Sequence, residues 1–261
     1  MNAVNFGPEA AGLSCHNRFT SREAVMRNLL VLWIFAVIFM PLSALAADAY
    51  TAVTIDPGKE RLSFHWKDAR GHRIASLSGL ARQAKEQGRT LVFATNAGIF
   101  AKDFTPLGLF VADGKTRRPL NTGTGGGNFF MQPNGVFYVD GTGGHIARTA
   151  GFKPTPDISL ATQSGPMLVE TGVINSQFAV KSKNRLVRSG VGINRDGKIV
   201  FVISNGPVSF YDFARYFRDD LRCDNALYLD GVISRMYAPA QGRRDTDGDF
   251  VGMLAVTKAA K

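Results

Sequence analysis

Short stretches in which hydrophobic and polar residues alternate recur along most of the chain, a pattern typical of β-strands. The first two such stretches, residues 51–55 and 61–67, are separated by Asp56-Pro57-Gly58, which favours a turn. We therefore predict that these two strands form a hairpin.

A second hairpin is predicted later in the chain. Residues 188–193 and 198–204 are rich in apolar residues, and Asp196-Gly197 between them is a preferred turn pair. Further strands are predicted at 108–112, at two or three places within 129–149, on both sides of Gln163-Ser164-Gly165-Pro166 within 160–170, and at 250–257.

Two segments instead carry the spacing of amphipathic helices. In residues 76–87 the apolar residues fall on one face, and Gly88 follows as a stop signal. Ser209 and Asp212 form a capping box before apolar residues at helical spacing, which predicts a helix of about four turns ending near Leu221. We interpret the aromatic stripe on this second helix as core rather than as a cofactor site.

Two uninterrupted apolar runs predict strands that are buried on both faces, and each leads into polar residues. Residues 90–95 precede Asn96, and residues 226–229 precede Asp230-Gly231. Burying a carboxylate costs on the order of several kcal/mol unless it is paired, hydrogen-bonded or hydrated, so we expect Asp230 where its strand opens into a cleft. In a parallel arrangement, Asn96 and Asp230 would meet at one sheet edge. The alternative is that Asp230-Gly231 is only a turn.

These elements together predict an α+β fold, a single domain with a β-rich mixed sheet core flanked by a few helices. Residues 47–261 are long enough for one sizeable core and contain no obvious linker or internal repeat. We therefore expect one domain after the N-terminal leader.

The N-terminal segment is typical of a secretory signal peptide. Residues 28–40 are almost entirely apolar, Arg27 precedes them, and Ala44-Leu45-Ala46 has small residues at cleavage positions. We expect cleavage after residue 46 or 47, no membrane-spanning segment in the mature protein, and a periplasmic or secreted location. Because Met26 directly precedes the basic residue, one interpretation is that residues 1–25 are an over-extended start.

Charge narrows the class of partner. The leader removes three basic and two acidic side chains from a chain of net charge +10, so the mature protein stays strongly basic. Such a protein attracts anionic envelope polymers, phosphates or membrane surfaces. Nucleic acid is not expected, since the basic residues are scattered and form no recognised binding motif.

The sequence predicts neither a metal nor a cofactor. Cys15 leaves with the leader, and the remaining Cys223 is interpreted as a buried thiol. The run from Asp245 to Asp249 resembles part of a calcium loop, but it lacks the glycine at the sixth position and the distal glutamate of that motif. The glycine-rich segment from Thr122 to Asn128 has backbone amides suited to a phosphate, yet a surface loop is the favoured interpretation.

Several strings in this order and spacing resemble the phosphodiester glycosidase family, which includes an enzyme that removes N-acetylglucosamine from a phosphodiester. The resemblance covers about Thr90 to Val256. It is carried by NAGIF at 96–100, QSGPMLV at 163–169, RSGVGI at 188–193, FVISNGPVSFYDFARYF at 201–217 and LYLDGVIS at 227–234.

The resemblance implies a set of site residues: catalytic Asp230, Arg188 and Asn96, and substrate-binding Gln163, Ser164, Gly165, Gly190, Gly231 and Ser234. Arg188 is expected to clamp the phosphate through a bidentate contact, while Asp230 stabilises the positive anomeric carbon or activates water. Asn96 and Ser234 are expected to orient sugar hydroxyls or that water. Where the family has glycines, this chain has Val232 and Ile233, which narrows the expected cleft.

The function implied is an exported hydrolase that cleaves an N-acetylglucosamine-like sugar from a phosphodiester-linked glycan. A sugar phosphate or glycan is thus the expected partner, and the sequence leaves the oligomeric state open. One alternative is a non-catalytic envelope module that binds anionic glycans. Another is hydrolysis of a different bond, such as that of a nucleotide-linked sugar, by the same residues.

Overall fold

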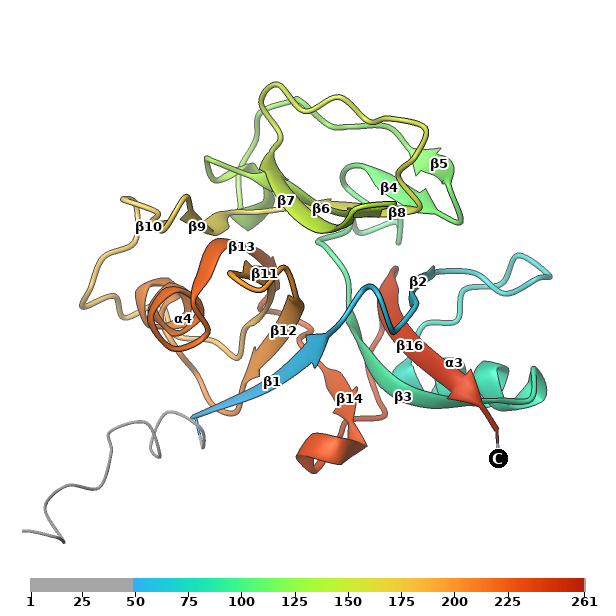
Figure 1. Ribbon diagram of the computed structural model, residues 1–261. Helices are drawn as coiled ribbons and strands as arrows, with labels where there is room; N and C mark the ends of the chain where they lie inside the picture. Colours follow the sequence, from blue (N-terminus) through green and yellow to red (C-terminus); the bar gives the residue numbers. More distant parts are fainter. Residues whose placement is uncertain (1–48, 261) are drawn as a thin grey trace, which may run out of the picture. The chain divides into compact units, whose positions relative to one another are not determined.

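The computed structural model describes residues 49–260, so the predicted leader at 1–46 lies outside the described residues. The described chain is β-rich, with three antiparallel sheets and two α-helices (Figure 1). Within this range no helix is long and apolar enough to cross a membrane.

The first sheet holds the strand that ends in Asp230. Its six strands run in the order β1 (Tyr50–Ile55), β12 (Ile199–Ser204), β11 (Ser189–Asn194), β13 (Cys223–Asp230), β9 (Met167–Glu170) and β10 (Val173–Ile174). Its central strands β12, β11 and β13 are buried along most of their length, which is why they read as apolar runs rather than alternating ones.

The other two sheets have five strands each. One has the order β15 (Arg243–Arg244), β14 (Met236–Ala238), β3 (Arg89–Asn96), β16 (Met253–Ala259) and β2 (Leu62–His65). The other has the order β5 (Lys115–Arg118), β4 (Phe110–Ala112), β8 (Leu160–Ser164), β6 (Gly135–Asp140) and β7 (Gly143–Arg148).

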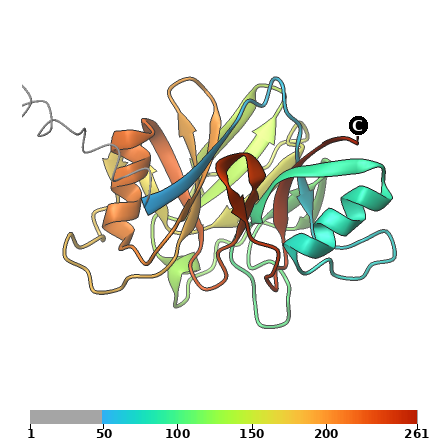
Figure 2. The ribbon, with the colours of Figure 1, turned by 90° about the horizontal axis from the view of Figure 1, so that it is seen from below.

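The two helices cover different sheets (Figure 2). Helix α3 (Leu77–Glu86) packs on β3, and the side chain of its N-cap Ser76 accepts a hydrogen bond from the Gly79 N–H. Helix α4 (Phe210–Arg215) covers the first sheet, and Ser209 accepts from the Asp212 N–H as the capping box predicts.

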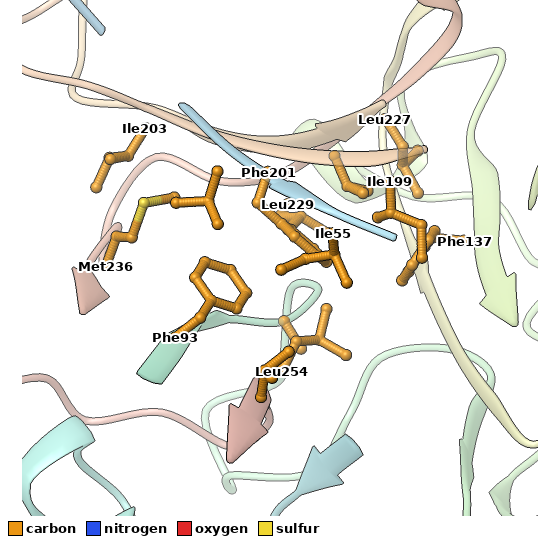
Figure 3. Packing of buried hydrophobic residues seen from close by; sticks show 14 of the residues in the cluster. Ile55, Phe93, Phe137, Ile199, Phe201, Ile203, Leu227, Leu229, Met236 and Leu254 are labelled. Atoms are coloured by element: carbon orange, nitrogen blue, oxygen red, sulfur yellow. The ribbon is translucent and has the colours of Figure 1, made fainter. Parts of the chain in front are cut away.

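A single apolar cluster joins all three sheets. It contains Phe93 of β3, Phe137 of β6 and Phe201 of β12, together with Leu227 of β13 and Leu254 of β16 (Figure 3). Burying each such side chain contributes roughly 1.5–3 kcal/mol. The cluster therefore fixes the strand ends of different sheets relative to one another, and the candidate site lies at these ends.

The structure confirms several predicted elements. The helix predicted at 76–87 is α3, and the second hairpin is β11–β12, with turn bonds between residues 194 and 198. The helix predicted over 209–221 is α-helical only to Arg215 and continues as a π-helical turn, η2 (Tyr216–Asp220).

Two predictions of strand pairing are wrong. The first predicted hairpin does not form, because β1 pairs with β12 and β2 pairs with β16. The predicted mixed sheet is replaced by antiparallel pairing throughout the described sheets, and β3 and β13 lie in different sheets. The alternating pattern predicts a strand but carries no information on a partner about 150 residues away.

Candidate functional site

Asp230 is the last residue of β13 and lies opposite Ser189 of β11, at an irregularity in the strand register. Its exposed fraction is only 8%. Asp230 Oδ1 accepts the Gly231 N–H at 2.6 Å and the Val232 N–H at 2.9 Å. Burial still raises the pKa of Asp230 above its ordinary value, although the turn amides act in the opposite direction.

Gly231 lies directly against the Tyr228 hydroxyl. A Cβ atom at this position would come within 2.0 Å of Tyr228 Oη and 3.6 Å of Arg188 Nη1. Only a glycine fits such a close approach without movement of its neighbour. The turn after Asp230 therefore contacts both Tyr228 and Arg188.

A buried polar network holds the main chain of Asp230 from the other side. Ser234 Oγ donates to the Asp230 carbonyl at 2.8 Å, and Ser189 Oγ lies 3.3 Å from the same oxygen. Asn96 Nδ2, at the end of β3, donates to Ser189 Oγ at 2.9 Å. Asn96 Oδ1 in turn accepts the Arg235 N–H at 3.2 Å. The strand ends of two sheets are thus joined at Asp230.

Arg188 is fully buried and has no carboxylate partner among the described residues. Nε donates to the Val208 carbonyl at 2.9 Å, and Nη2 donates to both oxygens of Asn184. Nη1 makes a longer contact of 3.4 Å with Tyr228 Oη. Burial lowers the pKa of Arg188, yet arginine keeps its charge in proteins.

The nitrogens of Arg188 are therefore unequally engaged. Because Nε and Nη2 are held by the chain, the bidentate contact expected from the sequence is not available in this conformation. Nη1 faces the turn at Gly231 and is the nitrogen with donor capacity left. The guanidinium also stacks on Phe210 at 3.7 Å, which keeps it in place without neutralising its charge.

Ser164 and Gln163 are buried, and both are hydrogen-bonded to other parts of the chain. Ser164 Oγ donates to the Leu229 carbonyl, one residue before Asp230. Gln163 uses its whole amide within the chain: the oxygen accepts from the Leu109 and Asn121 N–H groups, and the nitrogen donates to the Asn121 carbonyl and to Thr149 Oγ1. The hydrogen-bonding capacity of the Gln163 amide is thus used within the chain.

Two predicted glycines are sites of close packing. A Cβ atom at Gly190 would meet the Leu227 carbonyl and the rings of Phe213 and Phe217 at 3.0–3.1 Å. One at Gly165 would come within 2.8 Å of the Phe129 carbonyl. The structure therefore gathers Asn96, Ser164, Arg188, Gly231 and Ser234 around Asp230, whereas Gln163, Gly165 and Gly190 contact other parts of the chain.

Sequence reasoning missed three residues of this site: Ser189, Tyr228 and Asn128. Ser189 lies inside the RSGVGI string and could have been identified as the residue beside Arg188 that points to the opposite face of the strand. In the sequence, Tyr228 is recognisable only as part of an apolar run. Asn128 ends the glycine-rich segment, and its side chain forms a hydrogen bond with the Tyr228 hydroxyl that lowers the pKa of Tyr228.

No hollow, metal site or reactive thiol among the described residues offers an alternative to the site at Asp230. A hollow of about 610 Å³ is lined by residues 57–64 and 156–160, away from Asp230. No group of three or more metal-ligating side chains occurs between residues 49 and 260. Burial raises the pKa of the Cys223 thiol to about 12, which agrees with an inert thiol.

The sequence is similar to known proteins. The profile of the phosphodiester glycosidase family matches residues 89–255. An uncharacterized protein of Escherichia coli K12, YigE, is 36% identical over 252 residues, which cover 93% of this chain and 98% of the relative.

Two solved structures resemble the fold. The catalytic domain of the zebrafish N-acetylglucosamine-1-phosphodiester α-N-acetylglucosaminidase, auto-inhibited by its pro-peptide, matches with a TM-score of 0.55 and 16% identity, over 79% of this chain and 81% of that one. A protein from Burkholderia pseudomallei described as exported matches with a TM-score of 0.54 and 13% identity, over 79% and 73% of the two chains. At these identities the likeness concerns the fold alone.

Proposed function

The chain belongs to the phosphodiester glycosidase family, and we propose that it is an exported hydrolase that cleaves a sugar from a phosphodiester-linked glycan. The proposed sugar is N-acetylglucosamine or a close relative, the sugar in the name of the zebrafish enzyme with a similar fold. The basic charge of the chain and the leader-like N-terminus support an anionic substrate outside the cytoplasm.

One observation carries the proposal: a buried carboxylate and a buried guanidinium flank one turn, and neither forms an ion pair within the described residues. Asp230 is held by backbone amides, and Arg188 by neutral oxygens and an aromatic ring. A buried charge without a partner is costly, so a protein retains it where a ligand supplies the opposite charge. A sugar phosphate at its transition state carries both signs.

The chemistry assigns each group a task. Cleavage breaks the bond between the anomeric carbon and the phosphate oxygen, and the phosphate leaves with the electron pair. Asp230 stabilises the positive anomeric carbon or takes a proton from the attacking water. Arg188 compensates the charge of the phosphate through Nη1. Because a phosphate is already a good leaving group, charge matching matters more here than protonation.

Asn96 and Ser234 hold the main chain of Asp230 in this proposal. Asn96 is bonded to Ser189 and to the Arg235 N–H, and Ser234 is bonded to the Asp230 carbonyl. Catalysis depends on placing the reacting groups within a fraction of an ångström, so such supports affect rate without touching the substrate.

The test is product analysis of the mature protein with α-N-acetylglucosamine-1-phosphomethyl ester, beside Asp230→Asn. Wild type should release free sugar, and the variant should lose roughly a thousandfold or more of the rate. Asn retains the oxygen that accepts the turn amides, so the fold should stay intact. Asp220→Asn is the matched control, because burial also raises the pKa of Asp220 outside the site.

Two outcomes would contradict the proposal. Equal turnover by wild type and Asp230→Asn would remove Asp230 from the mechanism. Saturable glycan binding without release of sugar, at high protein concentration and over several glycosyl phosphodiesters, would favour the non-catalytic binding module instead.

A further inference from the structure

The Tyr228 hydroxyl is a buried donor whose own proton has no acceptor in the described part of the chain. Tyr228 is fully buried, and Arg188 Nη1 donates to its oxygen. The Asn128 side chain acts on the same oxygen in the direction that lowers the pKa of Tyr228, as a donor does. Burial outweighs both effects and raises the pKa of Tyr228, so the phenol stays protonated.

Arg188 Nη1 and the Asn128 side chain meet at the Tyr228 oxygen, and the Tyr228 O–H and the second N–H of Nη1 are left without an acceptor within the described residues. A buried donor without an acceptor costs about 1–3 kcal/mol, and a buried cation without a counter-charge costs more. A neutral hydroxyl of a sugar can accept these hydrogen bonds but brings no counter-charge for Arg188. An anionic oxygen accepts them and supplies the missing charge.

The glycine-rich segment leads directly to this point. Residues 122–127 are exposed and end at Asn128, and Asn128 is packed beside Gly165. The amides of residues 124–127 donate no hydrogen bond within residues 49–260. Displacing this segment to admit a ligand therefore breaks no bond from those amides, and the amides face solvent as further donors.

We propose that Tyr228 and Asn128, together with Arg188, form the subsite for the phosphoryl oxygens of the substrate, and that residues 124–127 line its outer wall. The inference deepens the function proposed above and rests on it for the identity of the substrate. It makes Tyr228 and Asn128 specificity-determining residues that select a phosphorylated sugar over a neutral one.

Isothermal titration calorimetry of the mature protein with inorganic phosphate and with N-acetylglucosamine 1-phosphate tests the subsite by measuring the dissociation constant of each probe. Tyr228→Phe keeps the ring against Phe210 and removes only the hydroxyl. It should weaken binding of both probes about ten- to a hundredfold, the value of a hydrogen bond to a charged group. Asn128→Asp adds a negative charge at the same place in a partly exposed position. It should weaken binding at least as much, and added salt should reduce its effect.

Matched controls are available far from the site in the fold. Tyr216→Phe alters a tyrosine that stacks on Tyr50, and Asn194→Asp alters the turn of the β11–β12 hairpin. Both should bind phosphate as wild type does. Thermal unfolding of every variant shows whether a loss of binding reflects loss of the fold.

Each outcome decides between the two proposals. If wild type binds neither probe, or if Tyr228→Phe and Asn128→Asp are folded and bind both as wild type does, the subsite is overturned. If wild type binds phosphate, the two variants lose it, and no glycosyl phosphodiester is turned over, the subsite stands and the hydrolase proposal fails.

Discussion

Two polar groups of side chains flank Asp230, and they differ in how far the chain satisfies them. On one side Asn96, Ser189 and Ser234 are bonded to one another and to the Asp230 carbonyl. On the other side Arg188 has no carboxylate partner in the described residues, and the Tyr228 hydroxyl has no acceptor there for its proton.

The difference separates support from recognition. Buried polar groups are normally satisfied within the protein, and a satisfied network makes a position rigid. Groups left with spare donors at the same depth are the ones that a ligand completes. We therefore interpret the serine and asparagine side as the scaffold of Asp230 and the arginine and tyrosine side as the place that receives the anion. Four predictions test this contrast, in decreasing order of expected size.

Replacing Arg188 should cost far more activity than stability. We expect Arg188→Met to lower turnover of a glycosyl phosphodiester by roughly a hundred- to a thousandfold, the value of a lost charge-stabilising donor. The protein should remain folded, because the variant also removes an unpaired buried charge. Arg185→Met is the control, since Arg185 is exposed and pairs with Asp212. Full activity of Arg188→Met would show that the anion binds elsewhere.

Replacing Ser189 should reveal the opposite balance. Ser189→Ala leaves Asn96 Nδ2 without its serine acceptor, so we expect the free energy of unfolding in urea to fall by about 1–3 kcal/mol. Turnover should fall about tenfold through displacement of Asp230. Ser159→Ala, which removes one bond at an exposed serine, should change stability by less than about 0.5 kcal/mol. A wild-type unfolding curve for Ser189→Ala would contradict the scaffold role.

The contact between Gly231 and Tyr228 allows a double-mutant cycle. Gly231→Ala places a methyl group against Tyr228 Oη and should destabilise the protein by about 1–3 kcal/mol. In a Tyr228→Phe background that oxygen is gone, and the nearest ring atom would lie 3.2 Å from the new Cβ. The penalty should therefore shrink by about 1 kcal/mol in urea unfolding. Additive effects would mean that the turn does not rest on the hydroxyl.

The smallest effect is a pH dependence of stability. Burial raises the pKa of Asp230 in the folded state, so the unfolded chain ionises first as pH rises. Wild type should lose stability relative to Asp230→Asn above the ordinary aspartate pKa, and the loss should level off above the raised value. Melting temperatures of the pair between pH 4 and pH 8 measure this difference. A constant difference over that range would contradict the raised pKa.

Local patterns predicted the elements better than their pairing. The capping serines Ser76 and Ser209 and the turn at Asp196-Gly197 each act on neighbours within a few residues, and all three appear as predicted. The partners of β1 and β2 are distant in sequence, so the pattern of either strand does not identify them. The sheets are antiparallel, and Asn96 and Asp230 meet through Ser189 rather than along a parallel edge.

The residues alone predict that Asp230 ends a buried strand, that Gly231 follows where a close approach is needed, and that the strings at Asn96 and Arg188 belong with them. They also carry the family resemblance that the comparisons confirm. Which donors each polar group uses within the chain depends on the packed fold, because packing brings together residues from different sheets. A polar side chain supports Asp230 when its neighbours use all of its donors. It can bind a ligand when those neighbours leave one donor free.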